Sequence, residues 1–226
     1  MEECFEFLEG NKFIDTIILS EGTYTGNFDI NKIITIQGPN VNKNGNSSER
    51  ISEAILLNTK TNILQPATIN GIKFKHTTFI TDALIIQSGA TIKNCVFERI
   101  ASVAGQTARG ISSSSTAENY RIINNLFTGS IDGGLFSGHK TWNSAMFLTN
   151  NGKICSIENN VFNNCRTALN IDNNPSNITC KLNEFSNCGT YISYGGTVQP
   201  TTGMITENNI FNISTLGSTL INNSNV

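Results

Sequence analysis

The side chains that are candidates for performing chemistry lie in two stretches of the chain. These stretches are residues 98–119 and 128–153, and the second contains Asp132, His139 and Lys140 within nine positions. A histidine can act as a general base near neutral pH, and a neighbouring carboxylate sets its pKa. These three residues are therefore the catalytic candidates of the sequence. A solvated His and Lys in a loop are the alternative interpretation.

The same stretches contain side chains suited to binding a sugar. Trp142 is the only Trp of the chain, and the apolar face of a sugar ring can stack on an indole. Arg109 and Lys153 supply positive charge for a polyanionic glycan. We take Arg109, Tyr120, Trp142 and Lys153 as the ligand-binding candidates. Trp142 can equally cover the flank of a hydrophobic core, and the charges can simply be solvated.

The composition excludes several classes of protein. Fifteen Lys and Arg against 17 Asp and Glu leave no basic excess for coating nucleic acid. No run of about 18 apolar residues is present, so we expect no insertion into a membrane. The 33 Asn, 30 Ile and 13 Phe indicate a folded all-β chain with many tight turns, rather than a disordered chain or a helical bundle.

A repeat built on Phe predicts the elements that position these loops. Six similar segments each end in a Phe, and the spacings between these Phe are 23, 30, 35, 23 and 26 residues. A base period of 23 residues is too short for a βαβ unit and fits coils of two or three short strands stacked on one another. The repeated positions are Phe74, Phe97, Phe127, Phe162, Phe185 and Phe211, with Asn125, Asn160, Asn183 and Asn209 two residues before the last four.

Stacking of coils places equal positions about 4.8 Å apart, so equal residues form columns. We expect the Phe column to fill a dry interior. We expect the Asn column to occupy a corner, where Asn tolerates the left-handed backbone conformation and its amide bonds the neighbouring coils. Cys165 and Cys188 each follow a Phe by three residues, so we expect them to be stacked neighbours, as small core residues or as a disulfide.

These coils resemble the right-handed parallel β-helix superfamily, the pectate-lyase-like fold, and β-helix modules of large bacterial surface or secreted proteins. The resemblance rests on the Ile-x-Asn-Asn-x-Phe segments and on residues 15–26 and 32–40, which are similar to first coils. It implies an all-β, single-stranded right-handed parallel β-helix (solenoid) with a short N-terminal capping helix. The expected layout is one domain over 1–226, with the cap in 1–14, stacked coils in 15–226, and the longest loops at about 98–119 and 128–153.

The catalytic sets of that superfamily are not recognisable in this chain. Calcium-dependent lyases use clusters of acidic ligands, whereas this chain has five Asp, and no two of them are adjacent. The paired carboxylates of polygalacturonase-type hydrolases have no counterpart either. The sequence therefore predicts no metal and no cofactor, and it favours a non-catalytic protein without deciding the question.

We therefore predict a non-catalytic module of a secreted or cell-surface protein that acts as a rigid scaffold, an adhesion surface or a glycan-binding surface. Polysaccharide is the expected ligand, and the expected location is extracellular, although this chain has no signal peptide. A polysaccharide lyase or glycoside hydrolase with a site in the 98–153 loops is one alternative. A fibre or shell subunit that stacks end to end is another. End-to-end or lateral self-association, or further coils of a longer chain, would cover the last coil.

Overall fold

The computed structural model describes residues 15–78, 81–100, 108–130, 141–174, 177–195, 204–212 and 219–223. These residues form 24 strands and no helix. The predicted capping helix falls in residues 1–14, which lie outside the described residues. No helix in the described part of the chain is long and apolar enough to cross a membrane.

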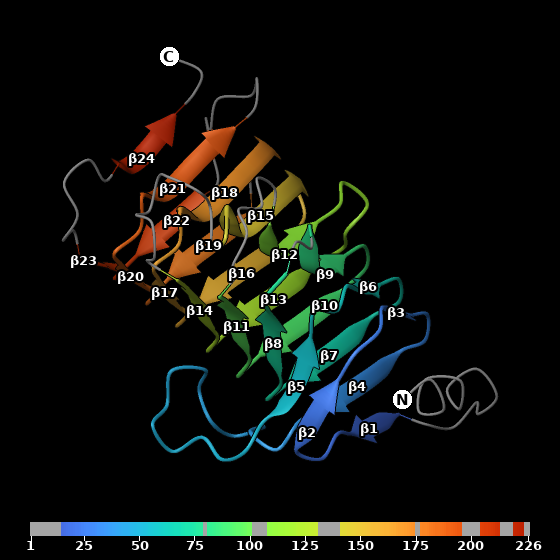
Figure 1. Cartoon of the computed structure of the whole chain (residues 1–226). Helices are drawn as coiled ribbons and strands as arrows, with labels where there is room; N and C mark the ends of the chain where they lie inside the picture. The colour runs from blue at the N-terminus through green and yellow to red at the C-terminus, as the bar shows by residue number, and fades with distance from the viewer. Residues whose placement is uncertain are drawn as a thin grey trace.

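The strands recur in threes along the chain, and each of the three joins a different parallel sheet of eight strands (Figure 1). Sheet A contains β1 (Thr16–Ile18), β4 (Ile34–Gln37), β7 (Ala67–Asn70), β10 (Ala90–Lys93), β13 (Tyr120–Ile123), β16 (Cys155–Glu158), β19 (Ile178–Lys181) and β22 (Met204–Glu207). Sheet B contains β2 (Gly22–Tyr24), β5 (Ala54–Leu57), β8 (Lys73–His76), β11 (Val96–Arg99), β14 (Leu126–Gly129), β17 (Val161–Asn163), β20 (Glu184–Ser186) and β23 (Ile210–Asn212). Sheet C contains β3 (Phe28–Ile30), β6 (Thr61–Ile63), β9 (Asp82–Ile86), β12 (Arg109–Ser113), β15 (Ser144–Asn151), β18 (Thr167–Asn174), β21 (Thr190–Gly195) and β24 (Thr219–Asn223).

Each coil of the chain thus contributes one strand to every sheet, and neighbouring coils pair in parallel. This confirms the predicted all-β class and is consistent with a parallel β-helix. The turns define three corners, which we name after the sheets they join. The A–B corner leads from sheet A to sheet B, the B–C corner leads from B to C, and the C–A corner closes the coil.

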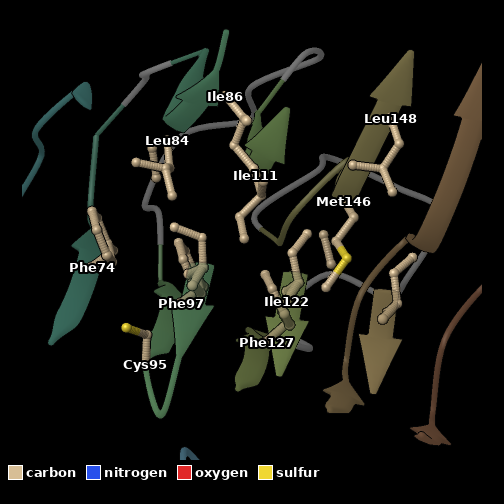
Figure 2. Packing of buried hydrophobic residues seen from close by; sticks show 14 of the residues in the cluster. Phe74, Leu84, Ile86, Cys95, Phe97, Ile111, Ile122, Phe127, Met146 and Leu148 are labelled. Carbon is tan, nitrogen blue, oxygen red and sulfur yellow. The ribbon is translucent and has the colours of Figure 1, made fainter. Parts of the chain in front are cut away.

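The interior is filled by columns of equal residues from successive coils. Figure 2 shows Phe74, Phe97 and Phe127 of sheet B pointing into the same space as Leu84 and Ile111 of sheet C. Consecutive rings in the whole Phe column are 4.7 to 5.1 Å apart and nearly parallel. That distance matches the spacing of strands in a sheet. The stack therefore fixes one register for the coils, because a slip by one residue would turn the rings outward.

The A–B corner contains two neighbouring columns of Asn, not one. The residue three before each Phe has the left-handed conformation, with φ of 57° at Asn94, 59° at Asn124 and 54° at Asn159. The predicted column, two before each Phe, forms the ladder of hydrogen bonds. Asn160 Oδ1 accepts the main-chain N–H of Asn125 at 2.9 Å, and its Nδ2 donates to Ile122 O at 2.9 Å.

The prediction that one Asn column performs both tasks is therefore wrong. The corner separates them because the left-handed residue turns the chain, which points the next side chain inward toward buried main-chain groups. The bonds repeat between Asn160 and Asn183 and between Asn183 and Asn209. Asn160 and Asn183 are at most 1% exposed. The ladder thus satisfies donors and acceptors that have no access to water.

Residues 38–53 cross the A–B corner and pack on the turns of later coils. The Arg50 guanidinium donates to Asn94 O at 2.8 Å and pairs with Glu53 Oε1 at 2.7 Å. The Gly45 N–H donates to Asn124 O at 2.7 Å. A side chain at Gly45 would place its Cβ 2.3 Å from Leu126 N, so only Gly allows this approach. This segment closes the A–B corner on its outer side.

Candidate functional site

The B–C corner departs from its own pattern at three successive coils. Asn58, Asn164 and Asn187 each follow the inward aromatic or aliphatic residue of sheet B by two positions and have φ of 51°, 56° and 50°. In the coils between Asn58 and Asn164, this column holds His76, Arg99 and Gly129, which are in register with one another. A histidine, an arginine and a glycine thus interrupt the column of left-handed Asn residues at this corner.

The same coils receive the longest inserted segments of this corner. Nine residues separate the end of β11 at Arg99 from the start of β12 at Arg109, and 14 residues separate the end of β14 at Gly129 from the start of β15 at Ser144. Only three residues separate β17 from β18, and three separate β20 from β21. Loops held by a rigid scaffold are common places for binding residues. The sequence changes at this corner therefore coincide with the longest insertions between sheets B and C.

Inside the B–C corner, His76, Arg99 and Trp142 form one buried group, and each is 0% exposed. The Arg99 Nε donates to Thr141 O at 3.1 Å, and its Nη1 donates to Thr78 O at 3.1 Å. The Trp142 ring centroid lies 5.9 Å from the Arg99 guanidinium carbon and 5.4 Å from the centroid of the His76 ring. Trp142 Nε1 donates to Phe97 O at 3.2 Å.

Burial changes the protonation of this group. Desolvation, followed by the charge of Arg99, lowers the pKa of His76 to about 4, while the main chain of Thr59 acts in the opposite direction. Desolvation also lowers the pKa of Arg99. His76 is therefore neutral at pH 7, and Arg99 supplies the charge of the group.

On the outer surface, Arg109 is the centre of a second group. Its guanidinium carbon lies 3.8 Å from the centroid of the Phe147 ring, and its Nη1 lies 3.8 Å from Asp82 Oδ1. Phe147 points outward from β15, since the neighbouring Met146 and Leu148 are fully buried. A guanidinium stacked on an aromatic face is a favourable pairing that leaves its N–H edges available for hydrogen bonds.

Three polar atoms of this surface group are unsatisfied. Asp82 Oδ1, Arg109 Nε and Asn170 Oδ1 are shielded from solvent and have no hydrogen-bond partner among the described residues. Asn170 is the register partner of Phe147 on the next coil. Polar atoms in such a position normally bond water or a ligand. Further along this face of sheet C, the outward side chains in register are Asp29, Asn62, Ile85, Ser112 and Ser193.

The structure separates the four predicted ligand-binding residues. Arg109 lies on the outer face with 31% of its side chain exposed. Trp142 is fully buried in the B–C corner, so neither face of its indole is available to a sugar, and the core interpretation is the one that fits. Tyr120 is 2% exposed and points into the coil, with its hydroxyl 3.3 Å from Ser113 Oγ. Lys153 is exposed past the end of β15, at the C–A corner, so sheet C separates it from Arg109.

The catalytic candidates Asp132, His139 and Lys140 lie outside the described residues. No group of three His, Cys, Asp or Glu side chains in the described ranges is arranged to hold a metal ion. Cys165 and Cys188 are fully buried and form no disulfide, and each thiol donates to a main-chain carbonyl oxygen, as expected of a small core residue. Comparisons with known protein families, with curated proteins and with solved structures give no match to this chain.

Sequence reasoning missed Asp82, Phe147 and Asn170. Phe147 stands between Met146 and Leu148, and the strand period of two places it opposite to them. A large aromatic residue at a position that must point outward was the available signal. Asp82 and Asn170 gave no such signal, because only the register of the coils brings them beside Arg109 and Phe147.

Proposed function

We propose that this chain is a non-catalytic β-helix module that binds a glycan on the outer face of sheet C. The observation that supports this most is the Arg109 guanidinium stacked on Phe147 beside Asp82. An aromatic ring, a fork of N–H donors, a carboxylate and amide side chains together match the apolar faces and hydroxyl groups of sugars.

The geometry of the sheet also suits an extended polymer. Outward positions recur about every 4.8 Å from coil to coil, so a chain that lies along the stack meets a row of regularly spaced side chains. Arg109 lies at one side of this face and Lys153 lies beyond its other side. These two positive charges favour a glycan that contains carboxylate groups.

We further propose right-handed winding, membership of the pectate-lyase-like superfamily and a secreted or cell-surface location. The support for these is the repeat itself, with its stacked Phe and its Asn ladder. A rigid stack held by continuous ladders is suited to present a surface at a distance from its attachment point.

A glycan-array screen followed by calorimetric titration of the best glycan tests the proposal. We expect Arg109→Ala and Phe147→Ala each to weaken binding about tenfold, since each removes a contact of about 1.4 kcal/mol. Arg121→Ala is the matched control, because Arg121 is an exposed arginine on sheet A. The control should bind like the wild type. Equal affinity for all three variants, or no glycan retained by the wild type, would contradict the proposal.

A reducing-sugar assay on the same preparation addresses the enzyme alternative. Steady release of reducing ends with turnover would show that the protein cleaves its glycan and would overturn the non-catalytic part of the proposal. In that case an Asp132→Asn, His139→Gln, Lys140→Met triple variant should abolish the release while retaining glycan affinity.

A further inference from the structure

We propose that the B–C corner binds one small monovalent anion, for which chloride is the natural probe, between His76 and Arg99. Arg99 carries a positive charge inside this corner. This side chain is 0% exposed, and no ion pair formed between described residues includes it. A buried cation with no opposite charge is strongly unfavourable, so a counter-ion at this point would stabilise the fold.

Several hydrogen-bonding atoms among the described residues remain unsatisfied at the same corner. Arg99 Nη2, both ring nitrogens of His76 and the hydroxyl of Thr59 have no hydrogen-bond partner in the described part of the chain. His76 and Arg99 are in register on neighbouring coils, and Thr59 lies beside His76. Arg99 Nη2 has N–H groups to donate and Thr59 adds an O–H, while the one N–H of the neutral imidazole is also within reach of the main chain of Thr59. Donors at neighbouring positions of one corner, together with one fixed positive charge, favour an anion over a cation.

The other side chains of the group explain why the occupant is small. Arg99 Nε and Nη1 already donate to the carbonyl oxygens of Thr141 and Thr78. Trp142 uses its only N–H on Phe97 O. A single free edge of the guanidinium therefore remains for the ligand. A monatomic anion needs no more than this edge and the two neighbouring donors, whereas a phosphate or sulfate would require more partners.

Anomalous diffraction from crystals grown in bromide tests the proposal directly. We expect a bromide peak in contact with Arg99 Nη2 and the His76 ring, in the buried corner and away from the Arg109 surface. An ordered water at this place, with no anomalous signal, would overturn the proposal. A side chain of the chain itself, paired with Arg99 in the crystal, would overturn it as well.

Thermal unfolding as a function of chloride gives an independent measurement. Ionic strength is held constant with methanesulfonate, a polyatomic anion without sugar hydroxyl groups. Above its Kd, each tenfold increase in chloride should raise the folding equilibrium constant of the wild type up to tenfold. Arg121→Met, which removes an exposed arginine, should keep this dependence, and Arg99→Met should lose it. If Arg99→Met does not fold, the chloride dependence of the wild type and Arg121→Met still decides, because a flat wild-type response contradicts the anion site. Neither experiment contains a glycan, so its result is independent of the proposed function.

Discussion

The A–B corner and the B–C corner join the same sheet B to its two neighbours, yet they are built by different rules. At the A–B corner, two Asn columns repeat with little change, and their buried amides are satisfied by one another and by the main chain. At the B–C corner, the Asn column gives way to His76, Arg99 and Gly129, and polar atoms are left without partners among the described residues. The regular corner is optimised for stability, and the irregular corner has the properties expected of a site.

The largest expected effect is at the ladder of the A–B corner. Asn160→Ala should lower the free energy of unfolding by about 3–5 kcal/mol, because it leaves the buried Asn125 N–H and Ile122 C=O groups without partners. Urea unfolding followed by circular dichroism measures this loss. Asn163→Ala, at a half-buried outward position of β17, is the control and should change stability by less than about 1 kcal/mol. Similar losses in both variants would mean that the ladder has no special role.

The B–C corner should make stability depend on pH. Folding lowers the pKa of His76 from 6.5 to about 4, so below pH 6.5 the unfolded state binds a proton that the folded state does not. Stability should therefore fall by about 3 kcal/mol as the pH decreases from 6.5 to 4, and this contribution should level off below pH 4. Urea unfolding of wild type and His76→Gln over this range isolates the effect. Parallel curves for the two proteins would contradict the burial of a neutral His76.

The segment that closes the A–B corner should be sensitive to a single methyl group. Gly45→Ala is expected to destabilise the protein by about 1–3 kcal/mol, because the new Cβ would overlap the main chain at Leu126 and Cys95. Gly89→Ala is the matched control, since its Cβ would meet its nearest atom at 3.4 Å. Differential scanning calorimetry should show a lower Tm for Gly45→Ala alone. Equal Tm values would show that residues 38–53 are not tightly held on this corner.

The smallest expected effect is a gain in stability at Leu182, which, like Gly71, replaces Asn in the left-handed column of the described coils. Leu182 occupies that column with φ of 57° and is 54% exposed. Leu182→Asn should stabilise the protein by about 0.5–1 kcal/mol, because Asn tolerates this conformation and little buried apolar area is lost. Chemical unfolding of the two proteins in parallel measures the gain. A loss of stability would show that Leu182 has a packing role that outweighs its backbone strain.

The sequence was sufficient to predict the stacked coils and their interior. The repeated Phe positions lie in one column because identical residues at a fixed period stack when coils stack. The division of the corner into a turning residue and a bonding residue was not predictable at this level, since adjacent Asn residues such as Asn159 and Asn160 are chemically identical. Only the backbone direction at each position distinguishes them.

The candidate site was predicted only through Arg109. Trp142 lies in a long insertion and Tyr120 lies directly after one, which made both aromatic residues candidates for binding a sugar. Both are instead buried in the coil interior, where large apolar groups are needed. The partners of Arg109 come from strands that are distant in sequence, and register rather than local pattern brings Asp82 and Phe147 to it. A site assembled across coils is therefore visible only once the coils are aligned in space.

Hydrogen–deuterium exchange with and without the glycan selected on the array tests directly whether the outer face of sheet C binds the glycan. We expect slower exchange on binding in β9, β12 and β15, the strands that contain Asp82, Arg109 and Phe147, with no change in β4, β7 and β10 of sheet A. Protection confined to sheet A or to residues 38–53 would contradict the claim that the outer face of sheet C, at the irregular corner, is where this protein binds its ligand.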